Sequence, residues 1–210
     1  TPMSVGNEMG GRNLLVFPEV TTDLVDAQLF CRTDAEVEKT FAEQLAAYAN
    51  ETALPFAVVG KGAVVSNTNI VRNSWIGDHA RIEGAAKIRN SVILSSLEES
   101  SHVYDSVILE NSNVQQGVKI HTGAEVQGSV LMMRTKIACK AIVKSSIVAP
   151  CCHIEEGEVN SSYVGPMTQM HHHSLLIAAL WPDGCGNIGY GANVGSNHTG
   201  RMPDQEVMPG

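Results

Sequence analysis

The chain has 210 residues and a net charge of −8 with histidine neutral, and 43% of its residues are apolar although only 5% are aromatic. This length suits one domain with a small appendage, and an interior poor in rings must be filled by aliphatic side chains. The acidic balance argues against nucleic acid as a partner, because such a surface repels a phosphate backbone.

Neither a run of 18 apolar residues nor a signal-peptide pattern is present, so we expect no membrane partner and a cytoplasmic protein. The cysteine count is odd and lacks a C-x-x-C pair, which favours reduced thiols over a disulfide framework or a zinc ribbon. The chain begins at Thr1 rather than at an initiator Met and ends in polar, turn-like sequence. We therefore expect it to be a piece of a longer protein.

The first twenty residues are predicted to be irregular and contain Gly6-Asn7-Glu8-Met9-Gly10-Gly11-Arg12. A glycine-rich backbone beside an arginine can bind a phosphate through converging N–H groups. The Lys-Ser/Thr pair of a P-loop is missing, so a plain polar loop is the alternative. Three residues of this stretch are candidate substrate-binding residues: Asn7, Glu8 and Arg12.

One helix is predicted from Thr33 to Asn50. It opens with the capping box Thr33-Asp34-Ala35-Glu36, and its apolar residues form one stripe: Val37, Phe41, Leu45 and Tyr48. Pro55 prevents continuation of the helix. We expect this helix to pack on the side or end of the following domain, with a partner-binding helix as the alternative. Residues 1–56 would form the appendage.

An aliphatic residue then recurs every six positions, which neither an amphipathic helix nor an alternating strand produces. The first series is Val58, Val64, Ile70, Ile76, Ile82, Ile88 and Leu94; after a looped-out stretch at residues 95–101 it returns as Ile108, Val114, Ile120, Val126, Ile137, Val143, Ile154 and Val159. One short strand and one turn per six residues predict a triangular coil of about 18 residues and hence a parallel β-helix.

A second, slower period supports the coil. Ser followed by two apolar residues recurs at Ser74, Ser91, Ser106, Ser129, Ser146 and Ser162, and we expect these to mark one face of successive coils. The rhythm breaks between Gly165 and Gly186, so we expect an irregular insertion with three histidines there, inside a β-helix domain spanning 57–210.

The six-residue pattern resembles the hexapeptide-repeat transferase superfamily over roughly residues 58–194. This resemblance implies a left-handed helix, commonly trimeric, with one flanking α-helix in this chain. In acyltransferases of that superfamily a histidine acts as general base toward the acceptor, and the acyl group comes from acetyl-CoA or another acyl-CoA.

Eight histidines occur, of which His171, His172 and His173 are consecutive and are candidate catalytic residues. The triplet could instead bind a metal ion or simply line a polar turn. A zinc carbonic anhydrase of this fold would need a second histidine five positions after His121, where Val126 stands, so no metal is expected. His79, His102, His121 and His153 are expected to be outward-facing polar residues.

The stretch from Ile188 to Gly200 is similar to a segment of the acetyltransferase domain in bifunctional enzymes that make UDP-N-acetylglucosamine. Asn197 and Gly200 match its sugar-phosphate turn, whereas His198 and Thr199 replace the expected Tyr and Asp. The resemblance implies a catalytic role for His198 and substrate binding by the polar residues around it: Asn197, Arg201, Asp204 and Glu206.

Nearly the whole chain also resembles an uncharacterised family of long bacterial proteins that combine a GNE-x-GGR-like stretch, hexapeptide repeats, a His-rich segment and a GSNHTGR-like motif. Two functions stay open. One is a transferase that moves an acyl or nucleotidyl group on a sugar phosphate or nucleotide sugar, as a homo-oligomer. The other is a non-catalytic oligomerisation or regulatory module of a nucleotidyltransferase-like protein.

Overall fold

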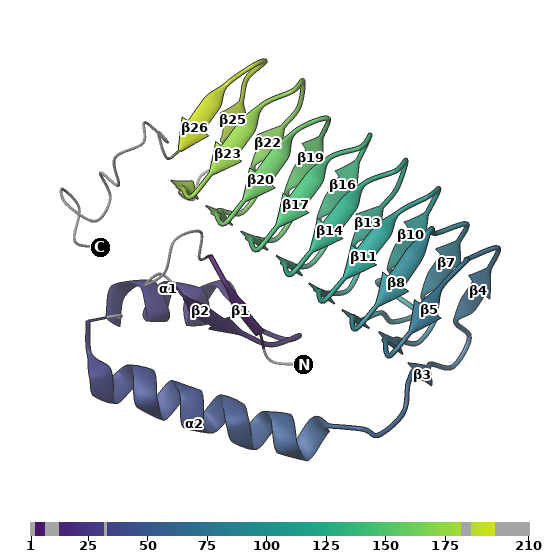
Figure 1. The fold of residues 1–210 in the computed structure, drawn as a ribbon, viewed down its shortest axis with the longest axis horizontal. Helices are drawn as coiled ribbons and strands as arrows, with labels where there is room; N and C mark the ends of the chain where they lie inside the picture. The colour runs from purple at the N-terminus through teal and green to yellow at the C-terminus, as the bar shows by residue number, and fades with distance from the viewer. Residues whose placement is uncertain (1–2, 7–12, 32, 182–185, 196–210) are drawn as a thin grey trace.

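The computed structural model describes residues 3–6, 13–31, 33–181 and 186–195. Within them the chain forms a parallel β-helix of eight turns, with a small α/β unit at its side (Figure 1). Each turn contributes one strand to each of three eight-stranded sheets. The predicted β-helix with helical sequence beside it is therefore confirmed.

The sheet that carries the histidines, called here the histidine sheet, contains β4 (Val64–Ser66), β7 (Arg81–Glu83), β10 (His102–Tyr104), β13 (Lys119–Ile120), β16 (Lys136–Ala138), β19 (His153–Glu155), β22 (Gln169–Met170) and β25 (Asn187–Ile188).

The covered sheet contains β3 (Val58–Val59), β6 (Trp75–Ile76), β9 (Val92–Ile93), β12 (Asn113–Val114), β15 (Val130–Leu131), β18 (Ile147–Val148), β21 (Tyr163–Val164) and β24 (Leu180–Trp181). The third sheet contains β5 (Val71–Arg72), β8 (Lys87–Arg89), β11 (Ile108–Glu110), β14 (Glu125–Gln127), β17 (Ile142–Lys144), β20 (Glu158–Asn160), β23 (Leu175–Ile177) and β26 (Asn193–Gly195).

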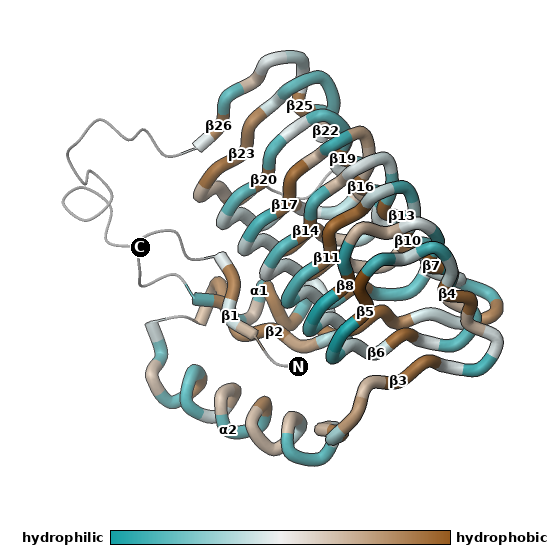
Figure 2. Tube along the Cα trace, turned by 45° about the vertical axis from the view of Figure 1, so that its right-hand side comes forward, coloured by the Kyte–Doolittle hydropathy of each residue, from teal (hydrophilic) through white to brown (hydrophobic). Residues whose placement is uncertain are grey.

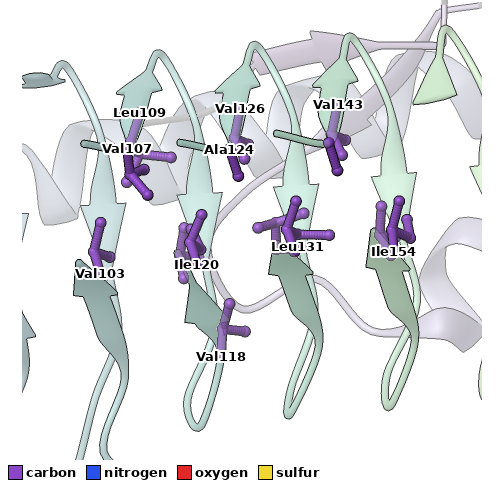
Figure 3. Close-up of a cluster of buried hydrophobic side chains, with 14 of the residues drawn as sticks. Val103, Val107, Leu109, Val118, Ile120, Ala124, Val126, Leu131, Val143 and Ile154 are labelled. Atoms are coloured by element: carbon purple, nitrogen blue, oxygen red, sulfur yellow. The ribbon is translucent and has the colours of Figure 1, made fainter. Parts of the chain in front are cut away.

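Inward-pointing aliphatic side chains from the three sheets fill the interior. One coil contributes three fully buried side chains: Ile120, Val126 and Leu131. The same positions in the next coil are again aliphatic, so like side chains stack along the axis (Figure 3). Figure 2 shows the hydrophobic positions returning from coil to coil. This stacking buries apolar surface that no single coil can bury alone.

Most coils contain 17 residues rather than the predicted 18, as the Ser91–Ser74 and Ser129–Ser112 hydrogen bonds show. The predicted series is also one residue out of phase at some positions. Val59 pairs with Ile76, not Val58, and Ile93 and Leu109 are fully buried where Leu94 and Ile108 were expected. Adjacent apolar pairs make the two phases indistinguishable in the sequence.

The predicted serines do mark one face of successive coils, but one of them differs from the prediction. Ser112, not Ser106, stacks between Ser91 and Ser129, each hydroxyl accepting from the backbone N–H of the serine in the next coil. Ser106 lies in a turn with φ of 64°. Residues 95–101 lengthen one coil, so that Ser91 and Ser112 are 21 residues apart. The looped-out stretch predicted there explains the lost phase.

The irregular insertion predicted at residues 165–186 is wrong for the part that the structure describes. β22, β23 and β24 pair in register with β19, β20 and β21. Met170 and Leu176 fill inward positions and are fully buried. The period was missed because its inward residues include Met170 and Trp181 rather than only Val and Ile.

The N-terminal unit is more ordered than predicted. β1 (Met3–Val5) and β2 (Leu14–Val16) form an antiparallel hairpin, followed by α1 (Thr22–Cys31) and α2 (Ala35–Thr52). The cap of α2 is Asp34 rather than Thr33, because its carboxylate accepts from the N–H groups of Glu36 and Val37. Two helices therefore flank the β-helix where the sequence predicted one.

The hairpin and α1 lie between α2 and the coils (Figure 1). Val5, Val16 and Val25 form one buried cluster with outward side chains of the covered sheet, among them Val130 and Ile147. The Gln115 side-chain amide donates to the carbonyls of Pro18 and Val20 at 3.0 and 2.7 Å. Among the described residues, the buried apolar contacts between this unit and the coils are at the covered sheet. None of the described helices is long and apolar enough to cross a membrane.

Candidate functional site

The outer surface of the histidine sheet carries two rows of side chains. Alternation along each three-residue strand buries the middle residue and turns its neighbours outward. Coil-to-coil register then stacks the first outward positions into what we call the basic row: Arg81, His102, Lys119, Lys136 and His153. Neighbouring members lie about 4.8 Å apart, the spacing of paired strands.

The second outward positions form a parallel row of Glu83, Tyr104, His121, Ala138, Glu155 and His171. His121 stacks on Tyr104, with ring centroids 4.8 Å apart and planes 10° from parallel. Its Nδ1 lies 2.8 Å from Thr122 Oγ1. If Nδ1–H donates to that hydroxyl, Nε2 carries the lone pair.

Glu155 joins three side chains from three consecutive coils. Its Oε1 accepts from Lys136 Nζ at 2.9 Å and lies 2.7 Å from His153 Nε2. Its Oε2 lies 3.3 Å from His171 Nδ1. We call Lys136, His153, Glu155 and His171 the Glu155 cluster. The rings of His153 and His171 meet edge to face at 4.6 Å, which places all these groups in one compact patch.

The charges of these groups shape their protonation. Although burial acts to raise it, hydrogen bonds and charge from Lys136 and His153 lower the pKa of Glu155 to about 2, so this carboxylate is ionised at neutral pH. Burial lowers the pKa of His153, and Lys136 adds to that effect. His153 is thus neutral at pH 7 and donates through Nε2–H to Glu155.

Burial, then the charge of Lys136, likewise lowers the pKa of His121. The pKa of His102 is lowered first by burial and then by Lys119 and Arg81, its neighbours in the basic row. These two half-buried histidines are therefore neutral at pH 7. A neutral imidazole accepts a proton, so His121 has the protonation state of a general base.

Of the predicted catalytic residues, only His171 lies in the Glu155 cluster. His172 and His173 are exposed and occupy a turn with φ of 65° and 57°. His198 lies outside the described residues, as do all the predicted substrate-binding residues: Asn7, Glu8, Arg12, Asn197, Arg201, Asp204 and Glu206.

His102, His121 and His153 face outward, as predicted, whereas His79 lies in a turn with φ of 58°. The sequence analysis did not predict that these histidines lie beside lysines and Glu155. One signal was available: His153-Ile154-Glu155 reads outward-inward-outward, and His171 follows one coil later.

Three of these side chains have the composition of a metal site. One ligand atom each from His153, Glu155 and His171 lies within 4.8 Å of the others. The sequence led us to expect no metal, because the spacing tested there was that of a different zinc site. Two imidazoles and one carboxylate are ligands that first-row transition metals accept.

Residues 1–204 match a family described as "Domain of unknown function (DUF4954)". The chain belongs to this family. It is also 26% identical over 206 residues to an uncharacterized protein of Treponema pallidum (strain Nichols). That alignment covers 97% of this chain and 28% of the relative, so the chain spans less than a third of the relative's length. No solved structure matches the chain.

Membership of the DUF4954 family agrees with the sequence-based resemblance to an uncharacterised bacterial family. The family description names no activity. The site therefore has to be interpreted from its own chemistry.

Proposed function

We propose that this chain is the transferase module of a protein that moves an acyl group from acyl-CoA to a sugar phosphate or nucleotide sugar, on the outer surface of the histidine sheet. The basic row is the observation that carries the proposal. In a chain with a net charge of −8, one sheet stacks Arg81, Lys119 and Lys136 on alternate or consecutive coils. Phosphate groups of substrate and donor suit such a row.

Lys119 is the member best placed to meet a phosphate. Its side chain is exposed, and within the described residues it forms no ion pair. Arg81 lies 3.8 Å from Glu83, and Lys136 is held by Glu155. By contrast, Lys87 and Lys144 on the third sheet pair with Glu110 and Glu125.

His121 serves as the general base in this proposal. Nε2 accepts the proton of the acceptor hydroxyl or amine as that group attacks the thioester carbonyl. The new C–O or C–N bond forms as the C–S bond breaks, and the CoA thiolate takes the proton back from the imidazolium. Lys136, a member of the Glu155 cluster, lies on the coil after that of His121, since Lys119 pairs with Lys136 and Ile120 with Ile137.

Incubation of the full chain with acetyl-CoA and a panel of sugar phosphates and nucleotide sugars tests this function. We expect release of CoA thiol and an acylated product identified by mass. His121→Gln should lower kcat by at least about 100-fold, the usual contribution of a general base. Lys119→Ala should raise KM about tenfold, because it removes a charge-assisted contact to phosphate.

His172→Ala is the matched control, since this exposed turn histidine lies outside the Glu155 cluster and should keep wild-type kcat. Circular dichroism checks that each variant is folded. The proposal fails if the wild-type chain neither turns over nor binds any of these substrates, or if His121→Gln keeps wild-type kcat.

A homo-oligomeric, non-catalytic module is the second candidate. The first coil exposes apolar side chains at its open end: Phe56, Val59, Val64, Val65 and Val71 are all at least 38% exposed. Such an end favours contact with a second copy. Under this candidate, sedimentation shows an oligomer in the wild type and in His121→Gln alike, and the assay above shows no product.

A further inference from the structure

We propose that His153, Glu155 and His171 bind one divalent transition-metal ion, with Zn²⁺ as the best-suited ion. Their donor atoms already lie together on one sheet surface. The proposal concerns the same surface as the transferase function but needs no substrate and no turnover.

The scaffold places the ligands without relying on a loop. His153 and Glu155 are two apart on β19, so both point outward from one strand. His171 directly follows β22 and stands opposite Glu155 in the next coil, since Ile154 pairs with Met170. Two ligands on one strand and a third directly after the paired strand are held more closely than ligands on loops.

The distances suit a tetrahedral ion. Ligand atoms bound to zinc at 2.0–2.1 Å are about 3.3 Å apart. Glu155 Oε2 and His171 Nδ1 are 3.3 Å apart, and the ligand atom that His153 offers lies within 4.8 Å of those of Glu155 and His171. Without a metal, His153 Nε2 is hydrogen-bonded to Glu155 Oε1. The metal ion takes the place of the proton in that hydrogen bond, and small side-chain rotations bring both imidazole nitrogens to the ion.

Lys136 supplies the outer support that metal-bound carboxylates need. Its ammonium group donates to Glu155 Oε1 at 2.9 Å, which leaves Oε2 available to the ion. Gln169 Oε1, at 3.5 Å from His171 Nε2, is placed to orient the other nitrogen of that ring. Such partners fix the orientation of the ligands and raise affinity by about 10- to 100-fold.

Three protein ligands leave the fourth position of a tetrahedral ion open, as in catalytic rather than structural zinc sites. The positive charge of Lys136 opposes a dication and favours an anion at that open position. A phosphate or carboxylate oxygen is therefore the ligand class that we assign to it.

Metal binding is measured on the full chain with Co²⁺ and Zn²⁺ as probes, without substrate. We expect one equivalent of Co²⁺ with the visible absorption of a four-coordinate ion, displaced by Zn²⁺. Glu155→Gln and His171→Ala should each weaken binding at least tenfold, with the circular dichroism spectrum unchanged.

The exposed His172 and His173 form the natural control, because a histidine run can bind metal by itself. A variant carrying both His172→Ala and His173→Ala should keep the site. The inference is overturned if the wild type binds no metal, if His171→Ala binds as the wild type does, or if the double variant loses binding. A protein that binds metal but shows no acyl transfer would reject only the transferase function.

Discussion

At the scale of single residues, burial separates side chains that the sequence presents as equivalent. Cys151 and Cys152 are adjacent, yet Cys151 is exposed in a turn and Cys152 is buried inside the coil. Cys152 Sγ lies 3.1 Å from the carbonyl of Gly165. Burial raises the pKa of the Cys152 thiol to about 11. Its thiolate form is therefore rare at neutral pH, and the described cysteines are all free thiols.

We predict that iodoacetamide at pH 8 modifies Cys151 and spares Cys152 in the folded chain, since about one Cys152 thiol in a thousand is ionised there. Any modification of Cys152 should grow tenfold per pH unit up to about pH 11. Peptide mass spectrometry of Cys151→Ser and Cys152→Ser chains checks this. Equal labelling of the two cysteines in native protein would contradict it.

At the scale of the elements, turns between strands require residues that tolerate positive φ. Asn73, Asn90 and Asn111 occupy such positions with φ of 48–49°. Their side chains also hydrogen-bond from coil to coil, Asn73 to Asn90 at 2.9 Å and Asn90 to Asn111 at 3.0 Å. Asparagine is among the few residues that adopt this conformation at low cost.

Asn90→Ala should lower the free energy of unfolding by about 1–3 kcal/mol, because it adds backbone strain and removes two hydrogen bonds. Asn90→Gly keeps the conformation and loses only the hydrogen bonds, so it should cost less. Urea denaturation compares the two. If alanine and glycine destabilise equally, strain at this turn is not a factor.

At the scale of the whole molecule, two kinds of contact join the N-terminal unit to the coils: apolar packing and hydrogen bonds. Apolar side chains of the hairpin and α1 pack on the covered sheet, and Gly6 N–H donates to the Ser145 carbonyl at 2.7 Å. The side-chain amide of Gln115 adds two hydrogen bonds to this unit, at the carbonyls of Pro18 and Val20. Within the part of the chain that the structure describes, these contacts involve the covered sheet and the turn at Ser145, and none involves the outer surface of the histidine sheet.

Gln115→Ala should loosen the N-terminal unit, since it leaves two buried carbonyls unpaired at a cost of about 1–3 kcal/mol. We expect limited proteolysis to remove residues before the first coil several times faster than in wild type, while the coils persist. Gln127→Ala is the control, because the Gln127 side-chain amide donates to Glu125 on the third sheet, away from the N-terminal unit. Unchanged cleavage in Gln115→Ala would contradict this interpretation.

The sequence alone determined the β-helix, because one inward aliphatic residue per six positions is a local pattern that each coil repeats. It also located the looped-out stretch at 95–101, where that pattern fails. It did not determine the phase at Val58-Val59, because two adjacent apolar residues satisfy either register. It also did not predict the regular coils after Gly165, where a methionine takes an inward position. The N-terminal hairpin was not predicted either.

Only the tertiary structure decided the candidate site. His121, Lys136, Glu155 and His171 come from four coils, and in the sequence only the one-coil interval from Glu155 to His171 indicates that any of them are neighbours. They meet because coils of 17 and 16 residues bring these four sequence positions into one register. The period that specifies the inward positions says nothing about which outward side chains meet, and the chemistry depends on those.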